Sequence, residues 1–135
     1  MTSRVFLIVL GVIALVAVAS YLPFGMGMFA PKANLEVTVP ELSAEARQGY
    51  ALYRKSCADC HGAKADGTDT GPPLIIRTYH PGRHADLAFY RAVKLGVRQH
   101  HWHLGNMPPI DGVSEANIAR IIRFIRETQK ANGVF

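Results

Sequence analysis

Cys57-Ala58-Asp59-Cys60-His61 holds both cysteines of this 135-residue chain. On a helix the two thiols would lie one turn apart, and an imidazole follows directly. This C-x-x-C-H pattern is typical of covalent haem attachment. In that chemistry each thiol adds across one vinyl group of the porphyrin and the imidazole binds the iron. We therefore predict one haem c, with Cys57 and Cys60 as its thioether anchors and His61 as an axial ligand.

Other uses of the same five residues fit the sequence less well. A zinc site would need a second pair of ligands at matching spacing. A thioredoxin-like redox pair would need a βαβ context, which the sequence does not offer. A structural disulfide outside the cytoplasm is the remaining alternative, and it would leave the adjacent His61 without a role.

A second axial ligand is predicted further along the chain. Met107 is the only methionine beyond residue 30, and it lies in Asn106-Met107-Pro108-Pro109. The two prolines fix φ and exclude helix, so the backbone should run extended as a strap over the haem face. A thioether ligand raises the haem potential, as suits an electron carrier. The rival axial ligands are three histidines just before the strap, His100, His101 and His103, and bis-His ligation would lower the potential.

The histidines themselves leave several interpretations open. His100, His101 and His103 surround Trp102, and His80 and His84 lie upstream. They could donate hydrogen bonds to haem propionates, line a docking surface, bind a second metal such as copper, or remain solvated. Spacing alone does not choose among these roles, because metal ligands must converge in three dimensions.

Three short helices are predicted around the motif. The first begins at Ser43 and runs to about Ser56, the second covers residues 86–95, and the third begins after the N-cap Ser114 and ends near residues 132–133. Residues 63–84 are rich in Gly, Asp, Pro and His, and no periodicity orders them. No sheet is predicted. The domain is therefore expected to be all-α, with a thin core that a large apolar cofactor completes.

The N-terminus predicts a membrane anchor. Residues 5–22 are almost entirely apolar and residues 5–30 carry no charge, close to the roughly 20 residues that cross a bilayer. Arg4 and the amino terminus place residue 1 in the cytoplasm and the following domain in the periplasm. We expect an anchor at 1–30, an extended tether at 31–42 and a haem domain at 43–135. Cleavage after Ala19 is the alternative.

Together these features resemble a class I c-type cytochrome over roughly residues 42–132. The matching residues are Gly49, Tyr53, the motif with Gly62, Gly71-Pro72-Pro73-Leu74, Trp102, Met107-Pro108-Pro109 and Phe124-Ile125. The resemblance implies a cytochrome c fold around one haem.

It also implies roles for individual residues. The Pro72 carbonyl should accept the Nδ1 proton of His61. Gly49 should let the first helix cross the last one closely near Phe124. Trp102 resembles an indole that donates to a haem propionate, with an ordinary core tryptophan as the alternative.

The predicted function is single-electron transfer by a membrane-anchored monohaem carrier at the outer face of a bacterial cytoplasmic membrane. The expected partners are membrane redox complexes of a respiratory chain, such as a quinol-cytochrome c reductase, a dehydrogenase, a terminal oxidase or another reductase, together with membrane lipid. Cations around the haem edge would meet an acidic partner: Arg54, Lys55, Lys64, Lys94 and Arg98. The net charge of +5 is too mild to argue for nucleic acid.

With both axial positions filled, the protein is not expected to be an enzyme. Two alternatives remain. The chain could be a haem-bearing subunit fixed in a larger oxidase or dehydrogenase complex. Less favoured is a gas- or peroxide-binding haem protein in which Met107 is easily displaced.

Overall fold

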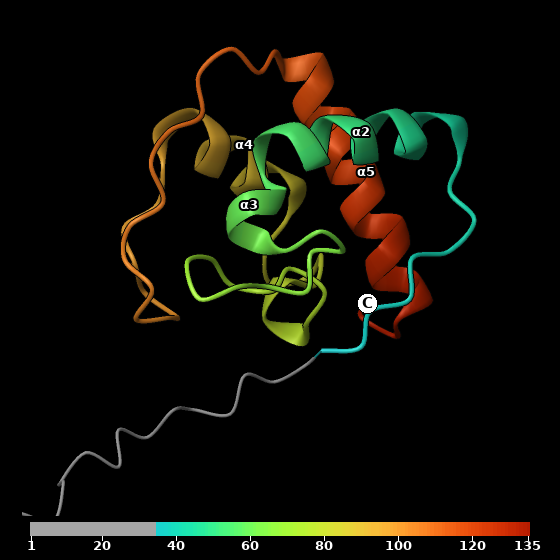
Figure 1. Cartoon of the computed structure of the whole chain (residues 1–135), viewed down its shortest axis with the longest axis horizontal. Helices are drawn as coiled ribbons and strands as arrows, with labels where there is room; N and C mark the ends of the chain where they lie inside the picture. Colours follow the sequence, from blue (N-terminus) through green and yellow to red (C-terminus); the bar gives the residue numbers. More distant parts are fainter. Residues whose placement is uncertain (1–34) are drawn as a thin grey trace, which may run out of the picture. The chain divides into compact units, whose positions relative to one another are not determined.

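The computed structural model describes residues 35–135, and the predicted anchor at 1–30 lies outside them. The described part contains α2 (Ala44–Ser56), α3 (Ala58–His61), the 3-10 helix η1 (Arg77–Tyr79), α4 (Asp86–Leu95) and α5 (Glu115–Ala131) (Figure 1). Over these residues β pairing is limited to one isolated bridge between Val97 and Met107. None of the helices described is long and apolar enough to cross a membrane. The prediction of an all-α domain is confirmed for this part of the chain.

The predicted helices agree closely with the observed ones because capping residues mark the helix ends in the sequence. The Ser43 hydroxyl caps α2 by accepting a hydrogen bond from the Ala46 N–H at 3.2 Å. The carboxylate that completes this cap comes from α5, where Glu127 accepts from the Ser43 N–H at 3.0 Å and from its hydroxyl at 2.7 Å. A tertiary contact therefore replaces the local acid of a capping box.

Helix α2 lies across α5, as Figure 1 shows, and the crossing is close. A Cβ placed on Gly49 would stand 1.8 Å from the Arg120 carbonyl oxygen of α5. The Phe124 ring packs between Tyr50 and Tyr53, with ring centroids 4.8 and 5.1 Å away. The close approach expected at Gly49 near Phe124 is thus present, and it builds the centre of the core.

Part of the predicted tether belongs to this core. Val37 and Leu42 are 4% and 8% exposed and pack in the same cluster as Phe124. The Asn132 side chain pairs with the Thr38 backbone, accepting from its N–H at 3.0 Å and donating to its carbonyl at 2.7 Å. Residues 35–42 are therefore attached to the domain and do not act as a free spacer, in contrast to the sequence prediction.

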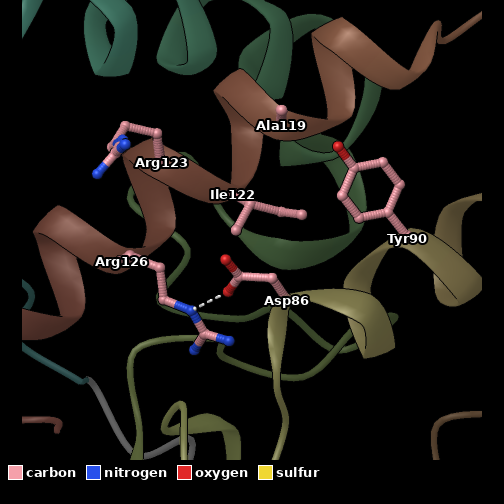
Figure 2. Close-up of a pocket in the computed structure, with 6 residues that line it drawn as sticks. All are labelled: Asp86, Tyr90, Ala119, Ile122, Arg123 and Arg126. Carbon is pink, nitrogen blue, oxygen red and sulfur yellow. Dashed lines mark hydrogen bonds and ion pairs between the residues drawn. The ribbon is translucent and has the colours of Figure 1, made fainter.

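The loop that periodicity could not order is held by polar side chains of α5. Gln129 is 1% exposed, and its Nε2 donates to the carbonyls of Leu74 at 2.8 Å and Tyr79 at 3.0 Å. Arg126 donates to the carbonyls of Tyr79 and His84. Its Nε also donates to Asp86 at the start of α4, at 2.8 Å (Figure 2). These bonds satisfy loop carbonyls that would otherwise be buried without partners.

Candidate haem-binding site

The C-x-x-C-H motif forms its own short helix, α3, directly after α2. The His61 N–H donates to the Cys57 carbonyl at 2.9 Å, which closes the helical turn. Both cysteines are free. Burial, and after it the neighbouring Cys60, raises the pKa of Cys57 to about 11, so this thiol is protonated at neutral pH. The motif therefore presents two uncrosslinked thiols one turn apart beside an imidazole.

The imidazole of His61 is oriented for ligation. Its Nδ1 lies 2.9 Å from the Pro72 carbonyl oxygen, the contact that the resemblance implied. A carbonyl only accepts, so Nδ1 carries the proton and Nε2 keeps its lone pair. Burial lowers the pKa of His61, while the bond to Pro72 opposes that shift. The ring is thus neutral at neutral pH and offers Nε2, the form that binds metals.

The backbone around the motif is packed too tightly for side chains at two positions. The Tyr53 hydroxyl of α2 donates to the Gly62 carbonyl at 2.8 Å, and Gly62 has a φ of 83°. At Gly71 a Cβ would stand 2.6 Å from the Cys60 carbonyl oxygen. Glycine at both places lets the following loop return against α3 and bring Pro72 to His61.

Met107 lies on an extended strap that is tied to the end of α4. Its backbone exchanges two hydrogen bonds with Val97, at 2.9 and 3.0 Å. Gly96 ends α4 with a φ of 72°, and a Cβ there would stand 2.6 Å from the Met107 carbonyl oxygen. The predicted extended backbone is present, and Met107 itself is half-buried. Its ligation of the iron stays a prediction.

Trp102 has a partner that the sequence analysis missed. Its indole N–H donates to the Tyr79 hydroxyl at 3.0 Å, linking the strap segment to η1. Burial raises the pKa of Tyr79, with the Trp102 bond opposing that shift, so Tyr79 is protonated at neutral pH. The contact of Trp102 with a haem propionate stays a prediction.

The residues present fit a covalently bound haem. Two free thiols and a neutral imidazole with an available Nε2 supply the attachment groups and one axial ligand. The loops after the motif and after α4 also leave several apolar side chains only half-buried, as expected of surfaces that a large apolar group covers: Ile76, Tyr79, Val97, Trp102 and Met107.

A pocket elsewhere in the described part shares no residue with this site. It lies between α4 and α5, has a volume of ≈ 230 Å³, and is lined by Asp86, Tyr90, Ala119, Ile122, Arg123 and Arg126 (Figure 2). Its size falls below the range of about 300 to 1,000 Å³ that is typical of ligand pockets. The Asp86–Arg126 ion pair lies along this pocket (Figure 2), so the pocket belongs to the contact between α4 and α5.

The remaining predicted residues divide into groups. His84, His100 and His101 come together in one cluster. His103 and His80 lie outside this cluster: His103 is exposed, and His80 accepts a hydrogen bond from the Gly82 N–H. All five cations proposed for docking are exposed: Arg54, Lys55, Lys64, Lys94 and Arg98. Of these, Lys94 also donates to the Val113 carbonyl at 3.1 Å.

Comparison with known proteins gives one family. The family model described as "Cytochrome C oxidase, cbb3-type, subunit III" matches residues 44–125, which is more than half of the chain and includes the whole motif and the Met107 strap. No curated protein and no solved structure gave a significant match.

Proposed function

Because the chain belongs to this family of cytochrome c domains, described as subunit III of cbb3-type cytochrome c oxidase, we propose that it is a membrane-anchored monohaem c-type cytochrome. It carries single electrons between redox complexes at the outer face of the cytoplasmic membrane. The observation that carries this proposal is the 2.9 Å contact between His61 Nδ1 and the Pro72 carbonyl, beside two free thiols.

Each residue of the site has a defined task in this proposal. Cys57 and Cys60 would bind the porphyrin through thioethers, and His61 and Met107 would hold its iron. Pro72 fixes the tautomer and direction of the His61 ring, which also makes His61 a more basic ligand. When bound, haem c supplies one-electron redox chemistry at its iron.

The proposed anchor keeps this domain close to the bilayer. Residues 35–42 are packed on the domain. If the anchor ends at residue 30, only residues 31–34 separate the two, and four residues span at most about 13 Å when fully extended. The domain then meets partners in the same membrane at high effective concentration and does not diffuse between membranes.

The family description also favours a second candidate, in which the chain is a fixed subunit of a cbb3-type oxidase. The same haem site would then receive electrons and pass them to the rest of that complex. The five exposed cations would lie at a permanent interface in this case, and at a transient docking surface in the first case.

Purification in mild detergent separates these two functions. A free carrier elutes alone and reduces a terminal oxidase in a salt-dependent reaction, because docking through exposed cations is screened by salt. A fixed subunit co-purifies with haem-containing partners at high salt. A redox titration followed by optical spectroscopy, run on the same material, fixes the axial ligands and bounds the potentials of the partners.

Cell fractionation with intact-mass measurement tests the anchor. We expect an uncleaved chain in the membrane fraction. A mature chain that begins at Ser20 and lies in the soluble periplasmic extract would make the protein a free shuttle and refute the anchor.

A further inference from the structure

Three histidines from two separate loops converge in the folded domain. One ring nitrogen from each of His84, His100 and His101 lies within 4.8 Å of the others. The ring centroids of His100 and His101 are 4.2 Å apart, and those of His84 and His101 are 5.3 Å apart. His84 precedes α4, whereas His100 and His101 lie in the segment that leads to the Met107 strap.

Two of these rings are held in the tautomer that suits a metal. His84 Nδ1 lies 2.7 Å from the Thr78 carbonyl oxygen, and His100 Nδ1 lies 2.9 Å from the Arg98 carbonyl oxygen. Since a carbonyl only accepts, each Nδ1 atom carries a proton, so in the neutral ring the lone pair lies on Nε2. Metal-binding histidines usually make this kind of outer hydrogen bond, which fixes the ring and raises its basicity.

The folded structure disfavours the cationic form of the third ring, His101. Desolvation, followed by the charges of His100, His84 and Arg83, lowers the pKa of His101.

We propose that His84, His100 and His101 form a second metal site, separate from the predicted haem ligands, which binds a divalent first-row ion that prefers imidazole, Zn²⁺ or Cu²⁺. The cluster contributes no carboxylate, so it does not suit Ca²⁺ or Mg²⁺, which require oxygen ligands. Three protein nitrogens leave a fourth position for water or another ligand.

The geometry needs only a small adjustment. Metal–nitrogen distances of about 2.0 to 2.1 Å in a tetrahedral site place the nitrogens about 3.3 Å apart, so the widest pair must approach. The exposed ring of His101 can turn toward His100 and the half-buried His84. His84 is the fixed member, since its carbonyl accepts from Arg126 of α5 and its ring contacts Tyr79 at a centroid distance of 5.0 Å.

A bound ion would cross-link two loops that the Trp102–Tyr79 hydrogen bond already joins. One loop, residues 77–85, is already tied to α5, and the other leads to the strap at Met107. Binding would therefore stabilise the segment that carries Met107, and the melting temperature should rise with metal concentration, because the ion binds only the folded arrangement.

The test uses the full-length, untagged haem-loaded protein in detergent, stripped with a chelator. Zn²⁺ and Cu²⁺ are titrated separately by calorimetry, and bound metal is counted by elemental analysis after desalting. We expect one equivalent of at least one of the two ions and a higher melting temperature. The tighter of the two, measured by competition, identifies the preferred metal.

Matched variants assign the site. His84→Ala, His100→Ala and His101→Ala should each weaken binding at least tenfold, whereas the controls His80→Ala and His103→Ala should bind as the parent does. An unchanged haem spectrum shows that each variant is folded. Absence of saturable binding to the parent protein would overturn the proposal. So would unchanged affinity when all three cluster histidines are replaced, or an equal loss in the His103→Ala control.

Discussion

The backbone of Gly49 in α2 lies so close to the Arg120 carbonyl oxygen in α5 that an added Cβ would stand 1.8 Å from it. The second atom in its way is the Arg120 carbonyl carbon, at 2.4 Å, so the obstruction is main chain and cannot rotate aside. Any side chain at this position must push the two helices apart around Phe124.

Gly49→Ala should therefore destabilise the domain in spite of the better helix propensity of alanine. Forced helix separation in a packed core costs about 1 to 3 kcal/mol or more, against a propensity gain of about 1 kcal/mol. Urea unfolding of the haem-loaded protein measures the difference. The control is Gln48→Ala, an exposed neighbour in the same helix. Equal stability of Gly49→Ala and the parent would contradict the tight crossing.

Alkaline pH should unfold the domain partly through Tyr53. Burial raises the pKa of Tyr53 well above the ordinary tyrosine value, and its hydroxyl donates to the Gly62 carbonyl. The folded state keeps this proton while the unfolded chain releases it above about pH 10. Stability is therefore fully present below that pH and falls as the pH rises beyond it, by up to about 1.4 kcal/mol per pH unit from this one group.

Tyr53→Phe isolates that contribution. The variant should lose about 1 kcal/mol at neutral pH with the hydrogen bond, and its stability should fall less steeply above about pH 10 than that of the parent. Denaturant unfolding of the reduced proteins over a pH series measures both effects. Parallel pH curves for the two proteins would show that Tyr53 does not titrate as described.

Gln129 should contribute more to the stability of the domain than a polar residue in a helix usually does. Gln129→Met keeps the volume and leaves the Leu74 carbonyl without its donor, while the Tyr79 carbonyl retains Arg126. An unsatisfied buried carbonyl costs about 1 to 3 kcal/mol. Thermal unfolding should show that loss for Gln129→Met and almost none for Lys130→Met at the exposed neighbour. A Gln129→Met protein as stable as the parent would mean that the loop does not depend on these bonds.

Met107→Ala tests the second axial ligand. If Met107 binds the iron, the variant should lose the weak near-infrared absorption of ferric thioether ligation, and its potential should fall. The reduced variant should also bind carbon monoxide at neutral pH, which the parent should not. The exposed control Asp111→Asn should behave as the parent does. An unchanged spectrum would assign the position to His100, His101 or His103, and carbon monoxide binding by the parent would favour the gas-binding alternative.

The helices could be predicted because their signals are local. Ser114 caps α5 through the Asn117 N–H, and Gly96 ends α4 with a positive φ. The separate helix α3 was missed because four residues carry no periodicity. The motif itself was predicted from spacing alone, since thiols one turn apart and the adjacent imidazole form a single chemical unit.

What the sequence could not supply depends on contacts between distant segments. Gln129 falls on the apolar stripe of α5 after Ile118, Ile122 and Ile125, and a polar residue at that position was the one available signal that α5 holds a loop. The convergence of His84 with His100 had no such signal, because each lies in an irregular loop whose path is set by bonds to other elements. The packing of Val37 likewise depends on a core that only the folded chain assembles.

The central claim is that one haem is bonded covalently to Cys57 and Cys60. The most direct test is intact-mass measurement of the purified protein after acid-acetone extraction. The account predicts a polypeptide heavier than the bare chain by one haem, with no haem in the solvent layer. A polypeptide of bare mass, with the haem free in the solvent layer, would contradict it.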